Sequence, residues 1–267
     1  MFLANPLFVK VYAMNNHSVR ERMAFCSSLA QDYLVNMFLL PQPLALAETS
    51  REFDFVTPQA FGRNMFPDDS RVLRFRNWCR QLCGKPRILT SSDVRKIRDE
   101  CESDIEAFCR LEELGFDPGM PNRNLATCYL RNFLDGSQGV PFIGQWEVGF
   151  ALWEQLPCWY TLHPSEVVLI WPPRNGYLST WGMLFEVREI AEKRSLSKPC
   201  ILAHPGHTPR AYFLARKIFG LSAVSFVPES DNWYYDEQSV QWWTRGEWPW
   251  IGYELFARLH HRWNGWM

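Results

Sequence analysis

The segment from residue 204 to residue 210, which reads HPGHTPR, concentrates residue types that bind charged groups and move protons. Arginine binds anions, and histidine changes its charge near neutral pH. Pro209 favours the first position of a helix, so we expect Thr208 to be the N-cap, with unpaired backbone N–H groups beside it. Such N–H groups and the helix dipole attract anions. The segment therefore predicts an anion site in which His207 and Arg210 hold the ligand; the alternative is a capped turn with surface histidines.

Two further segments are expected to reach the same place. The segment 144–147 follows an apolar run and sets Glu147 at a helix start, where it is either a general base or a structural cap. The segment 172–180 follows the run VVLIW, and its polar members are expected to orient the ligand: Arg174, Asn175, Ser179 and Thr180. The predicted catalytic residues are therefore His204, His207 and Glu147. Arg210 and Thr208, together with the four polar residues of the segment 172–180, are predicted to bind the substrate.

The second half of the chain supplies the elements that must position these segments. Short apolar runs at 140–144, 167–171, 200–203 and 223–227 predict strands. Amphipathic patterns predict helices at 146–156, 178–194, 208–219 and 249–263. Such an alternation is typical of a parallel sheet covered on both faces, whose ligands bind at the carboxyl ends of the strands. We therefore expect a Rossmann-like three-layer α/β sandwich with a mainly parallel sheet.

The first half of the chain is predicted to be mostly helical. Helices are expected at 20–37, 70–83 and 92–115, whereas 48–69 is expected to be a loop because it contains Pro58, Gly62 and Pro67. We predict an N-terminal region at 1–135, which is either an added domain or a diverged part of the same domain, and a Rossmann-like domain at 136–267.

Charge is sorted within the first half. Residues 71–98 contain nine basic residues and one acidic residue, whereas 99–117 contain eight acidic residues and one basic residue. The two blocks form either solvated faces that pair with each other or a cationic rim for an anionic ligand or partner.

Composition and the remaining motifs narrow the classes of function. The chain has 267 residues, a net charge of −1 and 21% charged residues, so it shows no global electrostatic reason to bind nucleic acid. No run reaches the roughly 18 apolar residues of a membrane helix, and no secretion signal is found. Eight cysteines without a CxxC pair predict reduced thiols and a cytoplasmic protein. The histidines lack metal-ligand spacing, and dinucleotide, P-loop and nucleophile-elbow motifs are not found.

The C-terminal part of the chain is rich in aromatic residues. Residues 233–266 contain seven of the 13 tryptophans and two tyrosines in the run Trp233-Tyr234-Tyr235. These rings either pack a C-terminal helix across the sheet, or form a wall over a ring-bearing ligand or a surface for a partner protein.

The second half resembles the SanA/YdcF/ElyC-type bacterial domain family. The resemblance rests on the turn His207-Thr208-Pro209-Arg210-Ala211, on the Gly220-Leu221 pair before a strand, and on the final helix from Glu254 to Trp266. Of a second family motif only Thr180 matches. The resemblance implies a Rossmann-like fold with a ligand site at the strand ends. For some members of the family it also implies a nucleotide-like ligand, for which S-adenosylmethionine is one candidate.

Two functions remain open from the sequence. The first is a small-molecule hydrolase or transferase that acts on an anionic or nucleotide-like substrate at the HPGHTPR turn. The second is a non-catalytic binding or interaction protein on a degenerate α/β scaffold. An enzyme predicts that Glu147, His204, His207 and Arg210 line one pocket, whereas a binding protein predicts that they are dispersed or tied into structural pairs.

Overall fold

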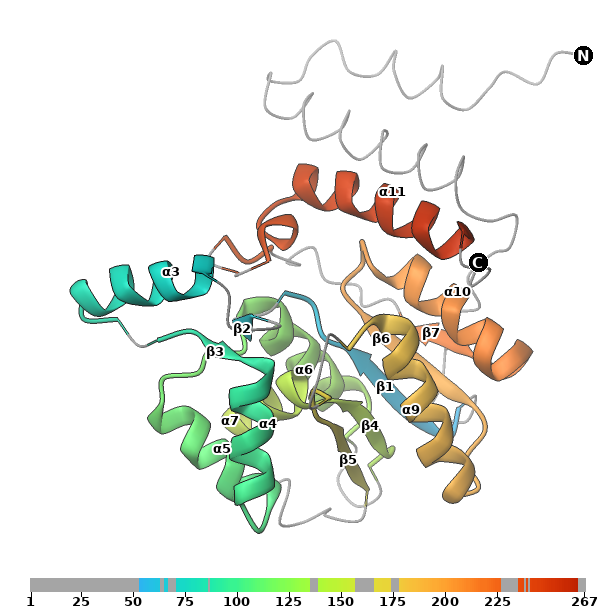
Figure 1. Cartoon of the computed structure of the whole chain (residues 1–267). Helices are drawn as coiled ribbons and strands as arrows, with labels where there is room; N and C mark the ends of the chain where they lie inside the picture. The colour runs from blue at the N-terminus through green and yellow to red at the C-terminus, as the bar shows by residue number, and fades with distance from the viewer. Residues whose placement is uncertain are drawn as a thin grey trace, which may run out of the picture. The chain divides into compact units, whose positions relative to one another are not determined.

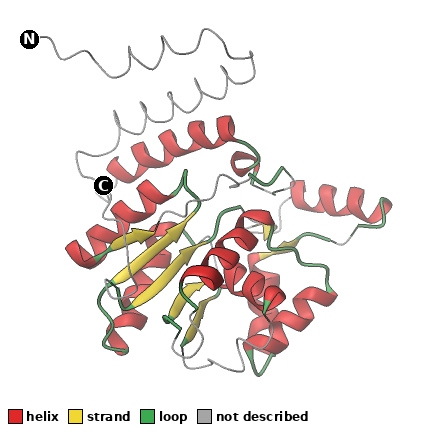
Figure 2. Ribbon diagram, turned by 180° about the vertical axis from the view of Figure 1, so that it is seen from behind, coloured by secondary structure: helices red, strands yellow, loops and turns green. Residues whose placement is uncertain are grey.

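The computed structural model describes residues 53–62, 65–66, 71–85, 87–134, 139–156, 166–173, 178–226, 235–237, 239 and 241–263. All of them belong to one compact unit that spans residues 44–267. They form a central parallel sheet with helices on both faces, as Figures 1 and 2 show from opposite sides. This confirms the predicted three-layer α/β fold. The helix expected at 20–37 lies outside the described residues, as do Arg174 and Asn175.

The central sheet has five strands in the order β5-β4-β1-β6-β7, and all neighbours are parallel. Their bounds are β1 Phe55–Gln59, β4 Phe142–Gln145, β5 Val167–Ile170, β6 Pro199–Ala203 and β7 Val224–Phe226. The chain runs from β1 outward through β4 to β5, and then returns past β1 to β6 and β7. The sheet order therefore reverses between β1 and β6. A second, two-stranded sheet pairs β2 (Met65–Phe66) with β3 (Leu89–Thr90).

Alternate residues of the strands enter the two layers of the core. Phe55 packs with α9 (Thr180–Lys193) and α10 (Thr208–Phe219), whereas Val56 packs on the opposite face. That opposite face is covered by α5, α6 and α7, with bounds Asp104–Glu113, Met120–Asn132 and Trp146–Gln155. Strands buried on both sides are apolar throughout, which explains why the runs in the second half predicted their positions.

The strand β1 corrects the expectation of a loop at 48–69. Pro58 and Gly62 are local signals against a strand. Phe55 and Val56 are nevertheless fully buried, and β1 pairs with both β4 and β6 in the centre of the sheet. Burial between two helical layers overrides the local preference. The sheet therefore combines β1, which precedes residue 136, with four strands that follow it, and the compact unit contains residues from both regions.

The helical pattern expected at 92–115 is also corrected, because it contains two helices. They are α4 (Ser91–Glu100) and α5, and Ser103 caps the second by accepting a hydrogen bond from the Glu106 N–H at 3.1 Å. The pairing expected between the charged blocks is confirmed around α4. The ion pairs are Arg95–Asp99, Lys96–Glu100 and Arg98–Asp104. The helix expected at 70–83 is confirmed as α3 (Arg71–Leu82).

Candidate functional site

A cavity opens at the carboxyl ends of β1 and β6, where the order of the sheet reverses. In open α/β sheets this crevice is the usual position of a ligand. The cavity is small, with about 70 Å³ of free volume, and part of it is open to solvent. Its described walls come from residues 60–62 after β1, from the start of α9, from the start of α10, and from α11 (Glu247–Trp263) with the preceding turn.

Two buried amides fix the wall that follows β1. The Gln145 Oε1 accepts a hydrogen bond from the Ala60 N–H at 2.7 Å, and the Asn122 Oδ1 accepts one from the Phe61 N–H at 2.9 Å. Gly62 then adopts a φ of +77°, and a Cβ there would lie 3.3 Å from the Thr244 Oγ1. The wall therefore needs glycine at this position, both for the backbone conformation and for the close approach.

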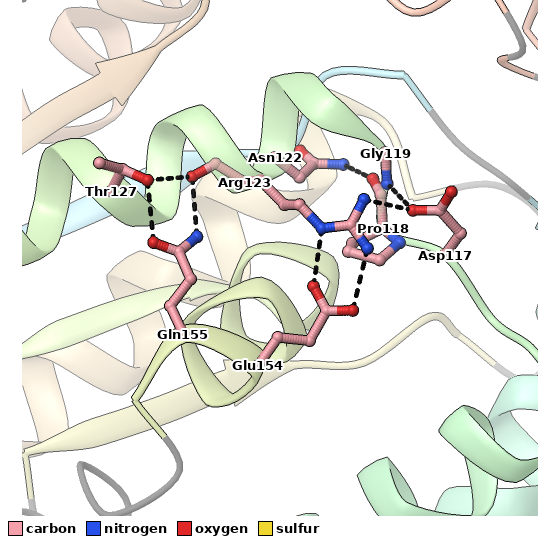
Figure 3. Close-up of polar contacts among 8 residues, drawn as sticks. All are labelled: Asp117, Pro118, Gly119, Asn122, Arg123, Thr127, Glu154 and Gln155. Carbon is pink, nitrogen blue, oxygen red and sulfur yellow. Dashed lines mark hydrogen bonds and ion pairs between the residues drawn. The ribbon is translucent and has the colours of Figure 1, made fainter.

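Asn122 also connects the cavity to a polar cluster between α6 and α7. Its Nδ2 donates to the Pro118 carbonyl at 2.7 Å. Beside it, Arg123 forms two parallel hydrogen bonds with Glu154, both at 2.9 Å, and a third with Asp117 at 2.8 Å (Figure 3). This cluster holds the α6 end from which Asn122 reaches the wall.

The turn before α10 closes on itself, which corrects two expectations. The N-cap is His207, and Thr208 is the first helical residue. The His204 carbonyl accepts hydrogen bonds from the N–H groups of His207 and Thr208 at 2.7 and 2.9 Å, and the His204 Nδ1 accepts one from the Gly206 N–H at 3.2 Å. These backbone N–H groups, which we expected to be unpaired, are therefore already used. An anion at this turn must be held by side chains.

His204 and Thr208 stabilise the turn and are not among the described residues that line the cavity. The His204 ring stacks on Phe61 with a centroid distance of 4.0 Å, and burial lowers its pKa to about 3. The Thr208 hydroxyl donates to the carbonyls of Ala203 and His204 at 3.2 and 3.1 Å. Both side chains are buried in contacts within the fold.

His207 lines the cavity and faces a hydroxyl group. Its Nε2 lies 3.5 Å from the Thr180 Oγ1, at the first residue of α9. Burial lowers its pKa well below the usual value, and the positive charge of Arg210 adds to this effect. His207 is therefore neutral at neutral pH and offers one ring nitrogen as a hydrogen-bond acceptor. The Ser179 Oγ beside it caps α9 by accepting a bond from the Gly182 N–H at 3.1 Å.

Arg210 belongs to a buried cluster of two arginines and one glutamate. Its Nε lies 3.1 and 2.9 Å from the two Glu254 oxygens, and the Arg258 Nε lies 2.8 Å from the Glu254 Oε1. The exposed fraction of each of the three side chains is 6% or less. Burial lowers the pKa of Arg258, although Glu254 opposes this shift. The cluster carries an excess positive charge, and the Arg258 Nη2 has no hydrogen-bond partner among the described residues.

Aromatic side chains complete the wall that α11 contributes. The Arg210 guanidinium lies 5.9 Å from the ring centroids of both Trp250 and Tyr253. Tyr253 stacks on Trp243 at 4.7 Å, and all three rings line the cavity. Trp250 is 3% exposed, so it also packs α11 against the body. Packing by these rings is therefore observed, whereas a ring-bearing ligand or a partner surface stays a prediction.

The remaining predicted residues divide by position. His207, Arg210, Ser179 and Thr180 line the cavity, whereas Glu147 is buried at the start of α7 and is not among the described lining residues. The described residues contain no group of three or more metal-ligating side chains that could hold an ion. Among those same residues, no helix is long and apolar enough to cross a membrane.

The sequence interpretation missed the residues of α11 that complete the site. Glu254 pairs with both Arg210 and Arg258. His261 lines the cavity, and burial lowers its pKa to about 4. One signal was available, because Glu254 and Arg258 are four residues apart on a helix. Nothing local indicated the contact of Glu254 with Arg210, which is 44 residues away in the sequence.

Comparisons of the chain with protein-family models, with curated proteins and with solved structures found no match in any of the three.

Proposed function

We propose that this protein binds a small, ring-bearing anion in the cavity between β1 and β6 and acts on it as a hydrolase or transferase. The observation that carries this proposal is the buried cluster in which Arg210, on the cavity wall, pairs with Glu254 of α11, which Arg258 shares. The resemblance to the SanA/YdcF/ElyC-type family remains a prediction and is not needed for the proposal.

Charge supports an anionic ligand. Burying an unbalanced charge is costly, because the protein interior solvates ions poorly. Glu254 neutralises one of the two arginines, and the lowered pKa values leave His207 and His261 uncharged at neutral pH. Arg210 uses its Nε for Glu254, and its side chain also lines the cavity. A carboxylate or phosphate at Arg210 would supply the missing negative charge and accept bonds from a guanidinium.

The walls support a ligand that also contains a flat ring. Trp243, Trp250 and Tyr253 contribute aromatic rings to one wall of the cavity. A nucleotide or an aryl phosphate or carboxylate would meet both requirements. S-adenosylmethionine fits less well, because its sulfonium and ammonium groups add positive charge beside two arginines.

His207 and Thr180 are the groups placed to take part in a reaction. A histidine with a strongly lowered pKa is a weak base in the empty site. An anion at Arg210 would offset the positive charge that contributes to this shift and would raise the pKa of His207 towards neutrality. His207 could then accept a proton from the Thr180 hydroxyl or from a water molecule at the ligand. Binding and proton transfer would be coupled in this way.

A second candidate is a binding protein without catalysis. It is favoured by the use of His204 in the turn, by the position of Glu147 away from the cavity lining, and by the ion pair of Arg210 with Glu254. Both functions share the anion site and differ in whether His207 moves a proton.

Calorimetric titration of the purified protein tests the shared site. The probes are inorganic phosphate, adenosine monophosphate, phenyl phosphate, benzoate and S-adenosylmethionine. At 100 times its Kd a ligand adds about 2.7 kcal/mol of stability, which a thermal melt detects independently. We expect a ring-bearing anion to bind and to lose its affinity in Arg210→Met. That variant leaves Glu254 and Arg258 as a balanced pair and should fold.

The matched control is Arg123→Met, which removes an arginine from the cluster between α6 and α7. Binding that survives Arg210→Met, or no binding by any anion, would refute the anion site. His207→Gln then separates the two candidates. An enzyme keeps its affinity and loses turnover of the ligand, followed by phosphorus NMR or chromatography. A binding protein shows no turnover in the native chain either.

A further inference from the structure

The helix α3 carries a stripe of large apolar side chains that face solvent. Phe75, Trp78 and Leu82 are 62%, 56% and 69% exposed. They are three and four residues apart, so they lie on one face of the helix, and the Phe75 and Trp78 rings are in contact at 5.9 Å. Large exposed apolar side chains that gather in one place are typical of interaction sites.

The opposite face of α3 holds the helix to the protein. Leu73 is buried, and the side chain of Asn77 exchanges two hydrogen bonds with the Ile88 backbone at 2.7 and 3.1 Å. In Figures 1 and 2 the helix stands apart from the layers that cover the central sheet. The attachment of one face therefore sets the orientation of the other, and the Phe75–Trp78–Leu82 stripe points away from the body.

The charge around α3 indicates which kind of partner its exposed stripe would bind. Residues 71–85 contain five basic residues and no acidic residue, whereas the next one, Arg87, is paired with Asp93 at 2.8 Å. The exposed face of α11 provides a contrast, because it presents Phe256, Leu259 and Trp263 on a helix with two acidic residues and two arginines. The α3 stripe thus combines apolar contact with a positive potential, which the α11 stripe lacks.

We propose that α3 binds the surface of membranes that contain anionic lipids. In this arrangement Phe75, Trp78 and Leu82 enter the boundary between headgroups and acyl chains, and the surrounding basic residues lie among the headgroups. A single line of aromatic and aliphatic side chains on a convex helix fits this boundary. Single-stranded nucleic acid instead needs rings that individual bases can stack on, and Leu82, at the C-terminal end of the stripe, offers no such ring.

Flotation of the full-length protein with lipid vesicles tests this proposal. We expect binding to vesicles of phosphatidylcholine with about 30% phosphatidylserine, with little binding to phosphatidylcholine alone, because each basic residue near the surface contributes about fivefold in affinity. The triple variant Phe75→Ser, Trp78→Ser and Leu82→Ser should lose at least about tenfold in affinity. All three positions are exposed, so the variant should keep the circular dichroism spectrum and melting temperature of the native protein.

The matched control is the double variant Phe256→Ser and Leu259→Ser on α11, which should bind the anionic vesicles as the native protein does. Three results would overturn the proposal. They are no binding to the anionic vesicles, unchanged binding by the triple variant, and equal binding to both kinds of vesicle. Binding of a poly-uridine oligonucleotide in place of vesicles, lost in the triple variant, would replace the membrane by nucleic acid. A native dimer that the triple variant converts to monomer would replace it by a second copy of the chain.

Discussion

The protein contains two clusters of arginine and carboxylate that balance their charges in opposite ways. Between α6 and α7, one arginine, Arg123, contacts two carboxylates, and its side chain is 34% exposed (Figure 3). Beside the cavity, two arginines share the single carboxylate of Glu254, and all three side chains are nearly fully buried. The first cluster has an excess of negative charge and the second an excess of positive charge.

The difference shows which cluster points to a ligand. Water and salt screen the charges around Arg123, so its excess of negative charge costs little, and the cluster serves to connect α6 with α7. Solvent does not reach the Arg210–Glu254–Arg258 cluster in the same way, so its excess of positive charge must be balanced or tolerated at a cost in stability. A cavity directly beside the unbalanced cluster offers a place for the balancing anion.

The largest effect is expected from breaking the buried cluster. Glu254→Leu leaves two buried arginines without a carboxylate and should lower the free energy of unfolding by about 3–5 kcal/mol. Glu154→Leu, which removes a carboxylate from Arg123, should lower it by no more than about 1 kcal/mol. Urea unfolding measures both. Should Glu254→Leu fail to fold, Glu254→Gln gives the same ranking, and similar losses for the two positions would contradict the contrast.

Asn122→Ala tests the connection between the two regions. The substitution leaves the buried Phe61 N–H without its acceptor and should cost about 1–3 kcal/mol of stability. It should also weaken ligand binding, because the wall after β1 loses one of its two anchors. Thr127→Ala, in the same polar cluster but away from the wall, is the control for binding. An affinity that is equal in both variants would show that the wall does not depend on Asn122.

The pH dependence of stability tests how deeply the histidines near the cavity are buried. Burial lowers the pKa of His204 to about 3 and that of His261 to about 4 in the folded protein. The unfolded chain therefore binds protons below about pH 6.5 that the folded chain does not, and stability should fall from pH 6.5 towards pH 4. Each histidine contributes up to about 1.4 kcal/mol per pH unit. In His261→Asn the slope of unfolding free energy against pH should be smaller by this amount, and an unchanged slope would place its pKa near the ordinary value.

The smallest effect is expected at the exposed rim of the α6–α7 cluster. Asp117→Asn removes one of the two carboxylates at Arg123 while the paired hydrogen bonds to Glu154 remain. The change in unfolding free energy should stay within about 0.5 kcal/mol, in low salt as in 0.5 M sodium chloride. A larger loss that disappears in high salt would mean that this cluster also depends on unscreened charge.

Local signals predicted those parts of the fold that depend on neighbours in the sequence. The bounds of α10 follow from Pro209 at its start and Gly220 at its end, where φ is +74°. The strand β6 follows from its continuous apolar run. By contrast, β1 contains Pro58 and was expected to be a loop, because its strand character depends on burial against both β4 and β6. The helix α6 was not predicted either, although Gly119 and Pro121 mark its start.

The candidate site divides in the same way. His207, Arg210, Ser179 and Thr180 were predicted because they follow the carboxyl ends of strands, and the structure places all four on the cavity wall. Their roles could not be predicted, because the hydrogen bonds that a turn makes with its own backbone N–H groups depend on its full three-dimensional geometry. Glu254 was missed as the partner of Arg210, because no local pattern links two helices that meet only after folding.

The sequence by itself therefore determined the alternation of strands and helices, and with it the placement of HPGHTPR at the end of a central strand. These features follow from hydrophobic periodicity and capping residues, which act over a few positions. The tertiary structure decided that β1 is the middle of the sheet, that the turn before α10 satisfies its own N–H groups, and that Arg210 shares Glu254 with Arg258. Burial and charge balance join residues far apart in the sequence, Arg210 and Glu254 across 44 positions and Ala60 and Gln145 across 85, and only the packed chain brings them within hydrogen-bonding distance.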